Sequence, residues 1–449
     1  MATYLTSNTG TATNAKKFTL SMWIKRGNLC DTNSQRFYQG YKDGNNRFYV
    51  MFDNTNSYPD SLWIYAVTGG ATQVYWYSAR KFRDIHGWYN FVFSADSTQA
   101  SQADRLKVYV NGVEETSWTK YNSPSQNIDW GNQLAQSNND LTISGTETQT
   151  QLFDGSMSHI HFIDGTAYDA TAFGSFDNDT GEWEINTAPS VTYGNNGFFI
   201  LKDGNSVTDQ SGNGNNFTVG GGTLTKTEDC PSNVFATLNP LNLQTGTKPI
   251  LQYGNTSVSG ASDGGTEFNG SSTLGMSTGK FYMEFKSTVS SNVHTMIGIT
   301  SNPSEDARSD HWMGTQSYSY GYYANDGKYY NGNTAYTYGN TYTSDIIGVA
   351  LDLDNNKLYF SKNGTWQNSG VPTSGSTGTG AISITDNEYF FGVSDASGTY
   401  ISSGDCNFGN GYFGTTAVSS AGTNASGIGI FEYDVPTGYT ALSTKGLNL

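Results

Sequence analysis

The sequence has 449 residues, of which 39 are acidic and 23 basic, and its formal net charge is -16. Only 14% of the residues are charged, whereas soluble domains average about 25%. The 53 glycines show no three-residue period, and 14% of the chain is aromatic. These figures exclude collagen, coiled coils and disordered acidic chains, and they favour short strands joined by tight turns.

The chain is long enough for two or three domains, each with its own core. Basic residues form no cluster that could follow a phosphate backbone, so we expect no nucleic-acid partner. Apolar runs stay well short of the roughly 18 residues of a membrane span, and we expect no membrane insertion. Three widely spaced cysteines (Cys30, Cys230 and Cys406) and an opening without signal-peptide character predict free thiols and synthesis in a cytoplasm.

In the first half, apolar and polar residues alternate with the period of a half-buried strand. Residues 17–24 are the clearest case, because Phe18, Leu20, Met22 and Ile24 share one face. Further strands are predicted at 47–52, 88–94, 105–110, 158–163 and 197–202. Asn111-Gly112 follows one of them and is a strong hairpin signal, because both turn residues must accept positive φ.

Between residues 219 and 231 the pattern breaks at a run of three glycines and at Pro231, which predicts a linker. The second half then returns to strand alternation, at 281–285, 297–299, 347–353, 358–360 and 389–393. We therefore predict an all-β chain of two tandem antiparallel jelly-roll or β-sandwich domains, 1–218 and 232–449, with helix limited to a turn or two.

Two sets of segments resemble known families. Residues 80–84, 88–92, 104–112 and 153–165 resemble the core of concanavalin A-like lectin and glucanase folds of the LamG type. Residues 277–285, 297–299, 321–323, 345–352 and 358–364 are similar, in order, to SPRY domains. The resemblance implies a LamG-like sandwich followed by a SPRY-like sandwich, both of which usually bind ligands through their loops.

Connecting segments at 173–176, 181–183, 193–198, 209–217, 233–240 and 435–442 look like those of surface proteins of tailed phages, especially marine ones, that pair these two modules. The resemblance implies a tail fibre, spike or capsid fibre, made in the host cytoplasm and located on the virion surface. It implies other virion proteins and a host-surface glycan or protein as partners, and a homo-oligomer, for which we expect a trimer. The chain opens almost directly on the first sandwich, so how it attaches to the particle stays open.

Three polar motifs are weighed as chemical sites. Glucanases of this fold need paired carboxylates on one strand face. The acidic cluster at 177–184 has the wrong spacing, so we expect no catalytic residues and no enzyme activity.

Two motifs could bind a metal ion. Asp352, Asp354 and Asn356 imitate the start of a calcium loop but lack its later ligands, so a hairpin turn is preferred. Calcium stays possible because LamG-like folds often hold it. His159 and His161 could share a metal or could pack.

Aromatic residues are dense in two stretches and alternate there with amides, hydroxyls and carboxylates, a mixture that suits sugar binding. The candidate ligand-binding residues are Trp63, Tyr75 and Trp76 in the first stretch, and Trp312, Tyr320, Tyr322, Tyr323, Asp326, Tyr329 and Tyr330 in the second. The alternative is that these rings pack the sheets or contact other subunits.

The functional hypothesis is a non-enzymatic phage surface protein that binds a host-surface glycan or protein, with no certain cofactor. The alternative is a purely structural decoration or fibre component that contacts only other virion proteins and has no host ligand.

Overall fold

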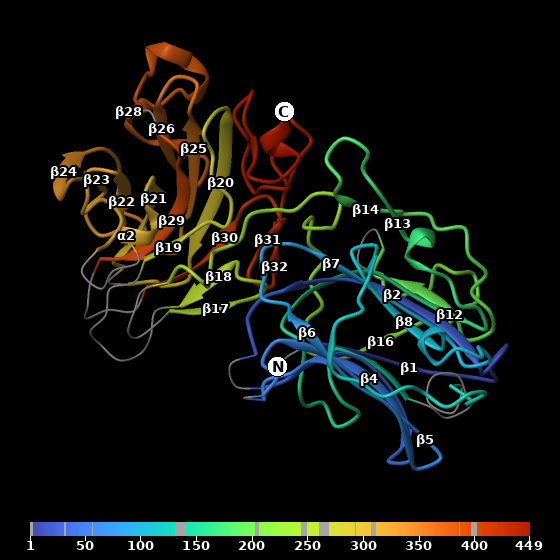
Figure 1. The fold of residues 1–449 in the computed structure, drawn as a ribbon. Coiled ribbons are helices and arrows are strands. Elements are labelled where there is room, and N and C mark those ends of the chain that lie inside the picture. The colour runs from blue at the N-terminus through green and yellow to red at the C-terminus, as the bar shows by residue number, and fades with distance from the viewer. Residues whose placement is uncertain are drawn as a thin grey trace. The chain divides into compact units, whose positions relative to one another are not determined.

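The computed structural model describes residues 3–30, 33–55, 57–130, 140–202, 206–243, 249–259, 269–291, 293–306, 311–385, 387–396 and 402–449. It divides into two compact units, Met1–Lys226 and Thr227–Leu449. The division falls inside the segment in which the sequence predicts a linker. The regular elements of each unit are almost all strands (Figure 1), which confirms the prediction of an all-β fold.

In the described residues of the first unit, two large antiparallel sheets form a sandwich. One, here called the aromatic sheet, has the order β10 (Trp118–Lys120), β6 (Ala71–Lys81), β5 (Ser61–Thr68), β4 (Asn46–Phe52), β3 (Gln35–Asp43), β11 (Asp140–Ile143), β1 (Tyr4–Asn8) and β16 (Thr218–Gly221). The other, here called the covered sheet, has the order β15 (Phe198–Ile200), β12 (Gly155–Asp164), β2 (Lys17–Arg26), β7 (Tyr89–Asp96), β8 (Leu106–Val110) and β9 (Val113–Glu114).

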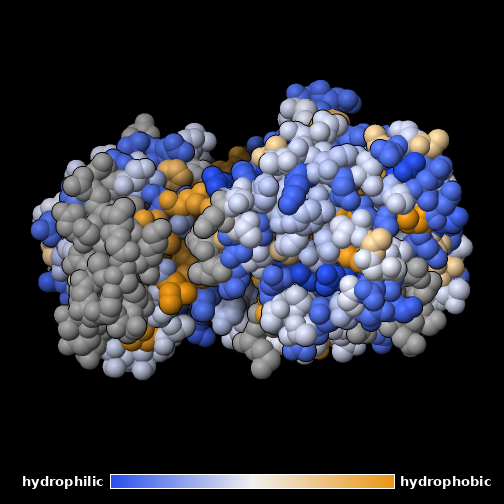
Figure 2. Space-filling view, turned by 60° about the horizontal axis from the view of Figure 1, so that its bottom comes forward, coloured by the Kyte–Doolittle hydropathy of each residue, from blue (hydrophilic) through white to orange (hydrophobic). Residues whose placement is uncertain are grey.

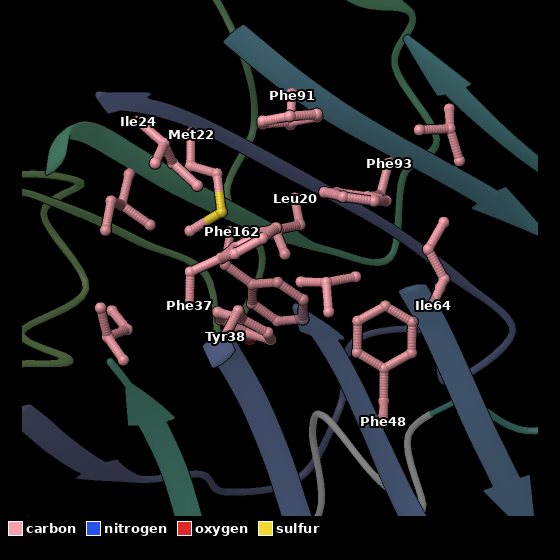
Figure 3. Packing of buried hydrophobic residues seen from close by; sticks show 14 of the residues in the cluster. Leu20, Met22, Ile24, Phe37, Tyr38, Phe48, Ile64, Phe91, Phe93 and Phe162 are labelled. Atoms are coloured by element: carbon pink, nitrogen blue, oxygen red, sulfur yellow. The ribbon is translucent and has the colours of Figure 1, made fainter. Parts of the chain in front are cut away.

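The core of the first unit lies between these sheets, as strand alternation requires. Figure 3 shows Tyr38, Phe48 and Ile64 pointing from the aromatic sheet toward side chains of the covered sheet, among them Leu20 and Phe93. All five are buried. The apolar faces predicted for 17–24 and 47–52 are therefore the faces that meet in the core.

The outer face of the covered sheet is overlaid by the segment that follows β12. This segment contains the short helix η2 (Ala170–Ala172) and the hairpin of β13 (Gly174–Phe176) and β14 (Trp183–Ile185). Phe173 packs with Val92 and Ile163 in a second apolar layer. Trp183 donates from its indole Nε1 to the Asn90 side-chain oxygen at 3.1 Å. The chain itself thus buries this face.

The predicted linker at 219–231 is in part ordered strand. β16 pairs with β1, and Leu5 lies opposite Val219. The ring of Tyr4 occupies the space where a side chain at Gly220 would lie. The glycine run is therefore needed for close packing inside the first unit as well as for the connection.

In the described part of the second unit, two antiparallel sheets again dominate. One has the order β17 (Ile250–Gln252), β18 (Ser257–Ser259), β30 (Ser403–Asn407), β20 (Lys280–Ser287), β25 (Ile346–Asp352), β26 (Lys357–Lys362) and β27 (Thr365–Trp366), with β28 (Ile382–Ser383) beside β26 and β33 (Thr440–Ala441) parallel to β20. The other has the order β19 (Asn269–Ser271), β29 (Phe390–Asp395), β21 (Thr295–Thr300), β22 (Ser319–Tyr323), β23 (Lys328–Asn331) and β24 (Thr334–Thr337).

Short elements complete the chain. A two-stranded pair joins β31 (Tyr412–Phe413) to β32 (Thr416–Ala417), and the helical turns are α2 (Pro303–Asp306), η1 (Gln102–Asp104), η3 (Gln367–Ser369), η4 (Pro372–Thr377) and η5 (Gly446–Asn448). Among the described residues, no helix has the length and apolar character needed to cross a bilayer. The expected Asn111-Gly112 hairpin is present, with φ of 47° and 78° at its two residues.

Candidate functional site: the aromatic sheet of the first unit

The face of the aromatic sheet that points away from the core is formed by two rows of side chains that cross four strands. In one row, Gln39, Tyr49, Tyr65 and Tyr75 lie opposite one another on β3, β4, β5 and β6. In the next row, the residues in the same positions are Arg36, Met51, Trp63 and Tyr77. Because alternate residues point to one side of a sheet, and an irregularity between Arg36 and Tyr38 brings Arg36 to the same side as Gln39, both rows lie on the outer face.

The rings of these rows contact one another directly. Trp63 lies at the centre, with ring centroids 5.4 Å from Tyr49, 5.9 Å from Tyr75 and 5.1 Å from Tyr77. Tyr65 completes the group at 5.1 Å from Tyr49 and 5.8 Å from Tyr75. We call Tyr49, Trp63, Tyr65, Tyr75 and Tyr77 the aromatic face. Aromatic cross-strand pairs of this kind stabilise a sheet by up to about 1 kcal/mol each.

The rings differ in how far they are buried. Tyr49 and Tyr77 are buried, and burial raises the pKa of both, to about 12 for Tyr49. Trp63, Tyr65 and Tyr75 are half-buried and leave ring surface available. The indole Nε1 of Trp63 is buried and has no hydrogen-bond partner among the described residues. The centre of the face is therefore an apolar surface made of rigid rings.

Polar groups surround the rings. Tyr58, from the segment between β4 and β5, stacks on Tyr77 with ring centroids 4.2 Å apart. Gln39 donates to the Glu147 carboxylate at 2.7 Å. The Arg36 guanidinium lies 3.8 Å from the Tyr49 ring centroid and donates to the Gln151 side-chain oxygen at 2.8 Å. An apolar centre with amides and charges around it is the usual composition of a small-molecule or sugar site.

The structure separates the candidates of the first stretch. Trp63 and Tyr75 lie on the aromatic face, but Trp76 is 2% exposed and packs in the core, where its ring stacks on Tyr121. Trp76 is therefore a packing residue. Val74 and Trp76 are two residues apart on β6, and both face the core. Strand alternation in the sequence could therefore have indicated that Trp76 packs inside. Tyr49 and Tyr58 join the site although sequence reasoning did not name them as candidates. The pairing of β4 with β5 brings Tyr49 there, and stacking on Tyr77 brings Tyr58.

Candidates of the second stretch divide between two faces. Trp312, Tyr323 and Tyr330 meet on the outer side of the sheet that contains β22 and β23. The ring centroid of Tyr330 lies 5.3 Å from that of Trp312 and 5.8 Å from that of Tyr323. Tyr330 donates from its hydroxyl to Asp326 at 2.8 Å. Burial is the main cause, and this hydrogen bond the second cause, of a Tyr330 pKa raised to about 12. Four of the predicted residues are thus brought together.

The remaining candidates of that stretch lie on the inner side of the same sheet. Tyr320 and Tyr322 are 5% and 0% exposed, and both belong to the core of the second unit. They are packing residues and offer no surface to a ligand. Tyr329 is half-buried and stacks on the exposed ring of Tyr336, with centroids 4.8 Å apart.

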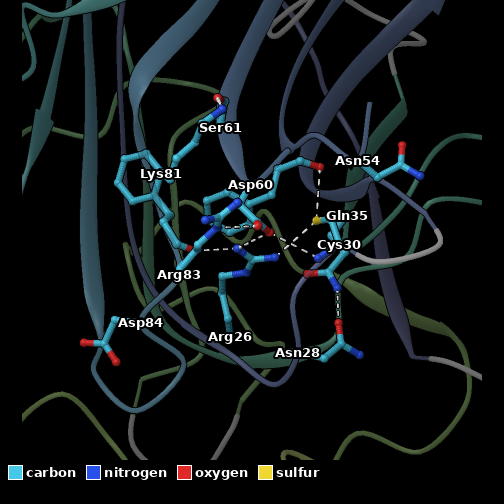
Figure 4. Close-up of polar contacts among 12 residues, drawn as sticks. Arg26, Asn28, Cys30, Gln35, Asn54, Asp60, Ser61, Lys81, Arg83 and Asp84 are labelled. Carbon is cyan, nitrogen blue, oxygen red and sulfur yellow. Dashed lines mark hydrogen bonds and ion pairs between the residues drawn. The ribbon is translucent and has the colours of Figure 1, made fainter. Parts of the chain in front are cut away.

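One end of the aromatic sheet carries a buried polar cluster (Figure 4). The Arg26 guanidinium forms an ion pair with Asp60 at 3.0 Å and donates to the Cys30 sulfur at 3.1 Å. Arg83 donates to the other Asp60 oxygen at 3.1 Å. Burial raises the pKa of the Cys30 thiol to about 11, so this cysteine is unreactive near neutral pH. The cluster holds strand ends together and offers no reactive group.

The polar motifs of the sequence have structural roles. Asp177 accepts hydrogen bonds from the main-chain N–H groups of Asp179 and Thr180, within the β13–β14 turn. Asp352 pairs with Lys280 at 3.1 Å beside the β25–β26 turn. His161 is buried against Phe199, and burial lowers its pKa well below the ordinary value. Within the described residues, no group of three or more His, Cys, Asp or Glu side chains could hold a metal ion, and the three cysteines form no disulfide.

Comparison with protein families matches each unit separately. Residues 2–171 match the concanavalin A-like lectin/glucanases superfamily, and residues 280–399 match the SPRY domain. The chain contains a LamG-like domain and a SPRY domain. A search of curated proteins gives no match. The LamG-like match covers all strands of the aromatic sheet except β16.

Several solved structures are similar to parts of the chain at low sequence identity. The SPRY domain of human HERC1 is 19% identical, with 38% of this chain and 96% of that chain covered and a TM-score of 0.30. A human SPRY domain is 18% identical, with 35% and 94% covered and a TM-score of 0.26. The heptameric SAP-like pentraxin from Limulus polyphemus is 13% identical, with 37% and 78% covered and a TM-score of 0.26. Values this low give no information on what the LamG-like and SPRY domains bind.

Proposed function

We propose that this protein is a non-enzymatic surface protein of a tailed-phage particle, and that its LamG-like domain binds a glycan of the host surface through the aromatic face. The observation that carries this proposal is the cluster of adjoining rings around Trp63 on one face of one sheet. Flat rings cover the C–H faces of sugars, and rigid aromatic side chains lose little conformational entropy on binding.

Two features support this choice of surface. The outer face of the covered sheet is already buried by the segment around Phe173 and Trp183, so the aromatic face is the large sheet face of this unit that keeps ring surface for a ligand. Both carboxylates beside the rings are held by hydrogen bonds, Glu147 by Gln39 and Asp53 by Ser34. We therefore expect binding and not the two-carboxylate chemistry of glycoside hydrolysis.

The location on a virion, synthesis in the host cytoplasm and contacts with other virion proteins come from the resemblance of the connecting segments to phage surface proteins. We propose a homo-oligomer, with a trimer as the specific expectation, because closed symmetry is the common state of soluble oligomers. Several weak sites on one particle would then give high avidity. Calcium remains a possible ligand of the LamG-like domain, with no residues assigned to it.

The test compares binding of the purified full chain and its variants to a panel of neutral and acidic polysaccharides by affinity electrophoresis. Trp63→Ala should abolish binding, because it removes the central ring. Tyr336→Ala, which removes an exposed ring from the SPRY domain, is the matched control and should bind normally. Trp63→Phe keeps the sheet packed and should weaken binding only in part. Full binding by Trp63→Ala would contradict the proposed surface.

The virion role needs its own measurement. Antibodies against the chain should label purified phage particles, and excess protein should compete with adsorption to the host. Particles that lack the chain, or adsorption that is unchanged in its excess, would contradict this part of the proposal.

A structural role in the particle is the second candidate, and exposed apolar side chains in the second unit favour it. Leu241, Ile250 and Tyr253 are 58%, 56% and 53% exposed. Figure 2 shows hydrophobic colour gathered in one area of this unit, at the left of the view. Such surfaces often form protein interfaces. If labelled particles show these side chains protected from solvent while adsorption is insensitive to the protein, the structural role is favoured.

A further inference from the structure

Basic side chains lie over the rings of the aromatic face. The Lys120 ammonium is 4.3 Å from the Tyr75 ring centroid, and the Arg47 guanidinium is 5.3 Å from that of Tyr65. These two rings are neighbours, 5.8 Å apart on paired strands. One ligand lying on the rings would therefore meet both cations. Cation–π contact of this kind holds the charge in place without neutralising it.

Within the part of the chain that the structure describes, no carboxylate forms an ion pair with either cation. Lys120 is exposed and Arg47 is half-buried. Several other basic side chains of the same unit are paired: Lys107, on the covered sheet, lies 3.0 Å from Asp104. A chain with a net charge of -16 has ample carboxylates to pair these cations as well. Lys42, Arg80 and Lys202 of this unit also form no ion pair among the described residues, so what distinguishes Arg47 and Lys120 is their position over two neighbouring rings of the aromatic face.

Arg36 has a different role from Arg47 and Lys120. It is 9% exposed, and its guanidinium donates to Gln39 and Gln151, which fixes it as part of the sheet. The acidic residue Glu147 lies at this end, where Gln39 holds its carboxylate. Lys120 is on β10, at the opposite end of the row of strands, beyond β6. Positive charge that is free to meet a ligand is therefore carried by Arg47 on β4 and by Lys120 on β10.

We propose that the aromatic face selects acidic polysaccharides, in which a carboxylate or sulfate group binds Arg47 and Lys120 while the sugar rings lie against Trp63. This inference rests on the proposed glycan-binding function and specifies its ligand class. Guanidinium and ammonium groups pair strongly with such anions once water is displaced. The negative charge of the whole chain disfavours non-specific attraction of acidic polymers, so selectivity depends on these two local cations.

The experiment measures binding of the full chain to dextran sulfate, polygalacturonate and neutral dextran. Dextran and dextran sulfate share a backbone, so their difference reports the sulfate group, and polygalacturonate reports the carboxylate. We expect at least one acidic polymer to bind about tenfold or more tightly than neutral dextran, and to lose affinity between about 50 mM and about 300 mM salt.

Two charge variants locate the selectivity. Arg47→Gln with Lys120→Gln should lower binding of the acidic polymer about tenfold. The control, Lys107→Gln with Lys328→Gln, makes the same change in net charge at residues that are not part of the aromatic face and should leave binding unchanged. Arg47→Lys with Lys120→Arg keeps both charges and should retain most of the binding. Near-UV circular dichroism checks that each variant is folded.

The outcomes separate this inference from the function on which it rests. Binding of neutral dextran equal to that of the acidic polymers would overturn the selectivity and leave the glycan site standing. Equal loss in the control pair would show that general charge, and not this face, attracts the polymer, which also overturns the inference. Failure of every polymer to bind, with Trp63→Ala indistinguishable from the unmodified chain, would overturn the proposed function itself.

Discussion

Glu284 binds the main chain at Tyr433, a residue 149 positions later in the sequence. The Glu284 carboxylate accepts hydrogen bonds from the N–H groups of Tyr433 and Glu432, each at 2.8 Å, and it is completely buried on β20. Asn407 and the Tyr282 hydroxyl donate to the same carboxylate at 3.3 Å and 3.2 Å. A single side chain thus holds the C-terminal segment against the centre of the second unit's sheet.

This arrangement predicts a pH-dependent stability. Burial raises the pKa of Glu284 to about 7, against an ordinary value of 4.5, although the main-chain hydrogen bonds act in the opposite direction. Between these two values the folded chain holds a proton that the unfolded chain has released. The contribution of this group is therefore fully present below about pH 4.5, and is lost as the pH rises to about 7, by on the order of 3 kcal/mol in the free energy of unfolding.

Urea unfolding of the unmodified chain and of Glu284→Gln, from pH 5 to pH 8, measures this effect. The variant cannot titrate at this position, so its curve should lack the fall. It should also be less stable at pH 5 by about 2 kcal/mol, because the amide NH₂ faces a main-chain N–H. Glu388→Gln, which changes an exposed glutamate of the same unit, should keep the pH dependence. Parallel curves for the unmodified chain and Glu284→Gln would contradict the assignment.

Sequence alternation predicted the strands well where one face of a strand meets a single core. Phe281, Met283 and Phe285 were expected to share a face, and all three lie in the core of the second unit. Nothing local predicts the buried Glu284, because its main-chain partners are nearly 150 residues away and a glutamate within an alternating strand is ordinarily placed on the solvent side.

The candidate site was predictable only in part. Aromatic density picked out Trp63 and Tyr75, but it also picked out Trp76, because density ignores which way alternate residues point. Alternation along β6 would have corrected this error, because Tyr75 and Trp76 are consecutive and must point to opposite faces of the sheet. Tyr49 and Tyr58 could not be placed at the site without knowing that β4 pairs with β5 and that Tyr58 folds back on Tyr77.

The ion pair of Arg26 and Asp60 predicts a large difference between the two arginines that contact this aspartate. The Arg26 side chain is 0% exposed, whereas that of Arg83 is 57% exposed. Asp60→Asn accepts the positive φ of 58° at this position but leaves the Arg26 charge buried without a counter-charge. It should lower the free energy of unfolding by about 3 to 5 kcal/mol.

The control for this pair is Arg83→Gln, which should cost less than about 1 kcal/mol because the lost ion pair is exposed on one side. Urea denaturation of both variants gives the comparison. Similar losses for Asp60→Asn and Arg83→Gln would show that the buried pair has no special contribution.

Gly112 is predicted to be intolerant of substitution for two reasons that can be separated. Its φ is 78°, and a Cβ atom there would lie 2.3 Å from the ring of Trp183. Gly181 has a similar φ of 73° but open space around it. Gly181→Ala should therefore show only the backbone cost of about 1 kcal/mol.

Gly112→Ala should cost clearly more, about 3 kcal/mol, because Trp183 must move and lose its hydrogen bond to Asn90. Thermal unfolding followed by tryptophan fluorescence measures both effects, since a displaced Trp183 changes its emission. Equal losses of stability for the two alanine variants would mean that Trp183 moves aside without a measurable cost in the free energy of unfolding.

Tyr322 and Tyr336 test whether the tyrosines of the second aromatic stretch pack or face outward. Tyr322 is 0% exposed and lies within 5.1 Å of the Phe360 ring, whereas Tyr336 is 42% exposed. Tyr322→Ala leaves a cavity in the core and should lower the free energy of unfolding by about 3 to 5 kcal/mol. Tyr336→Ala removes only a surface stack on Tyr329 and should cost less than about 1 kcal/mol. Chemical denaturation decides between them: if Tyr322→Ala is as stable as Tyr336→Ala, the inner side of β22 is not packed as described, and Tyr322 returns as a ligand-binding candidate.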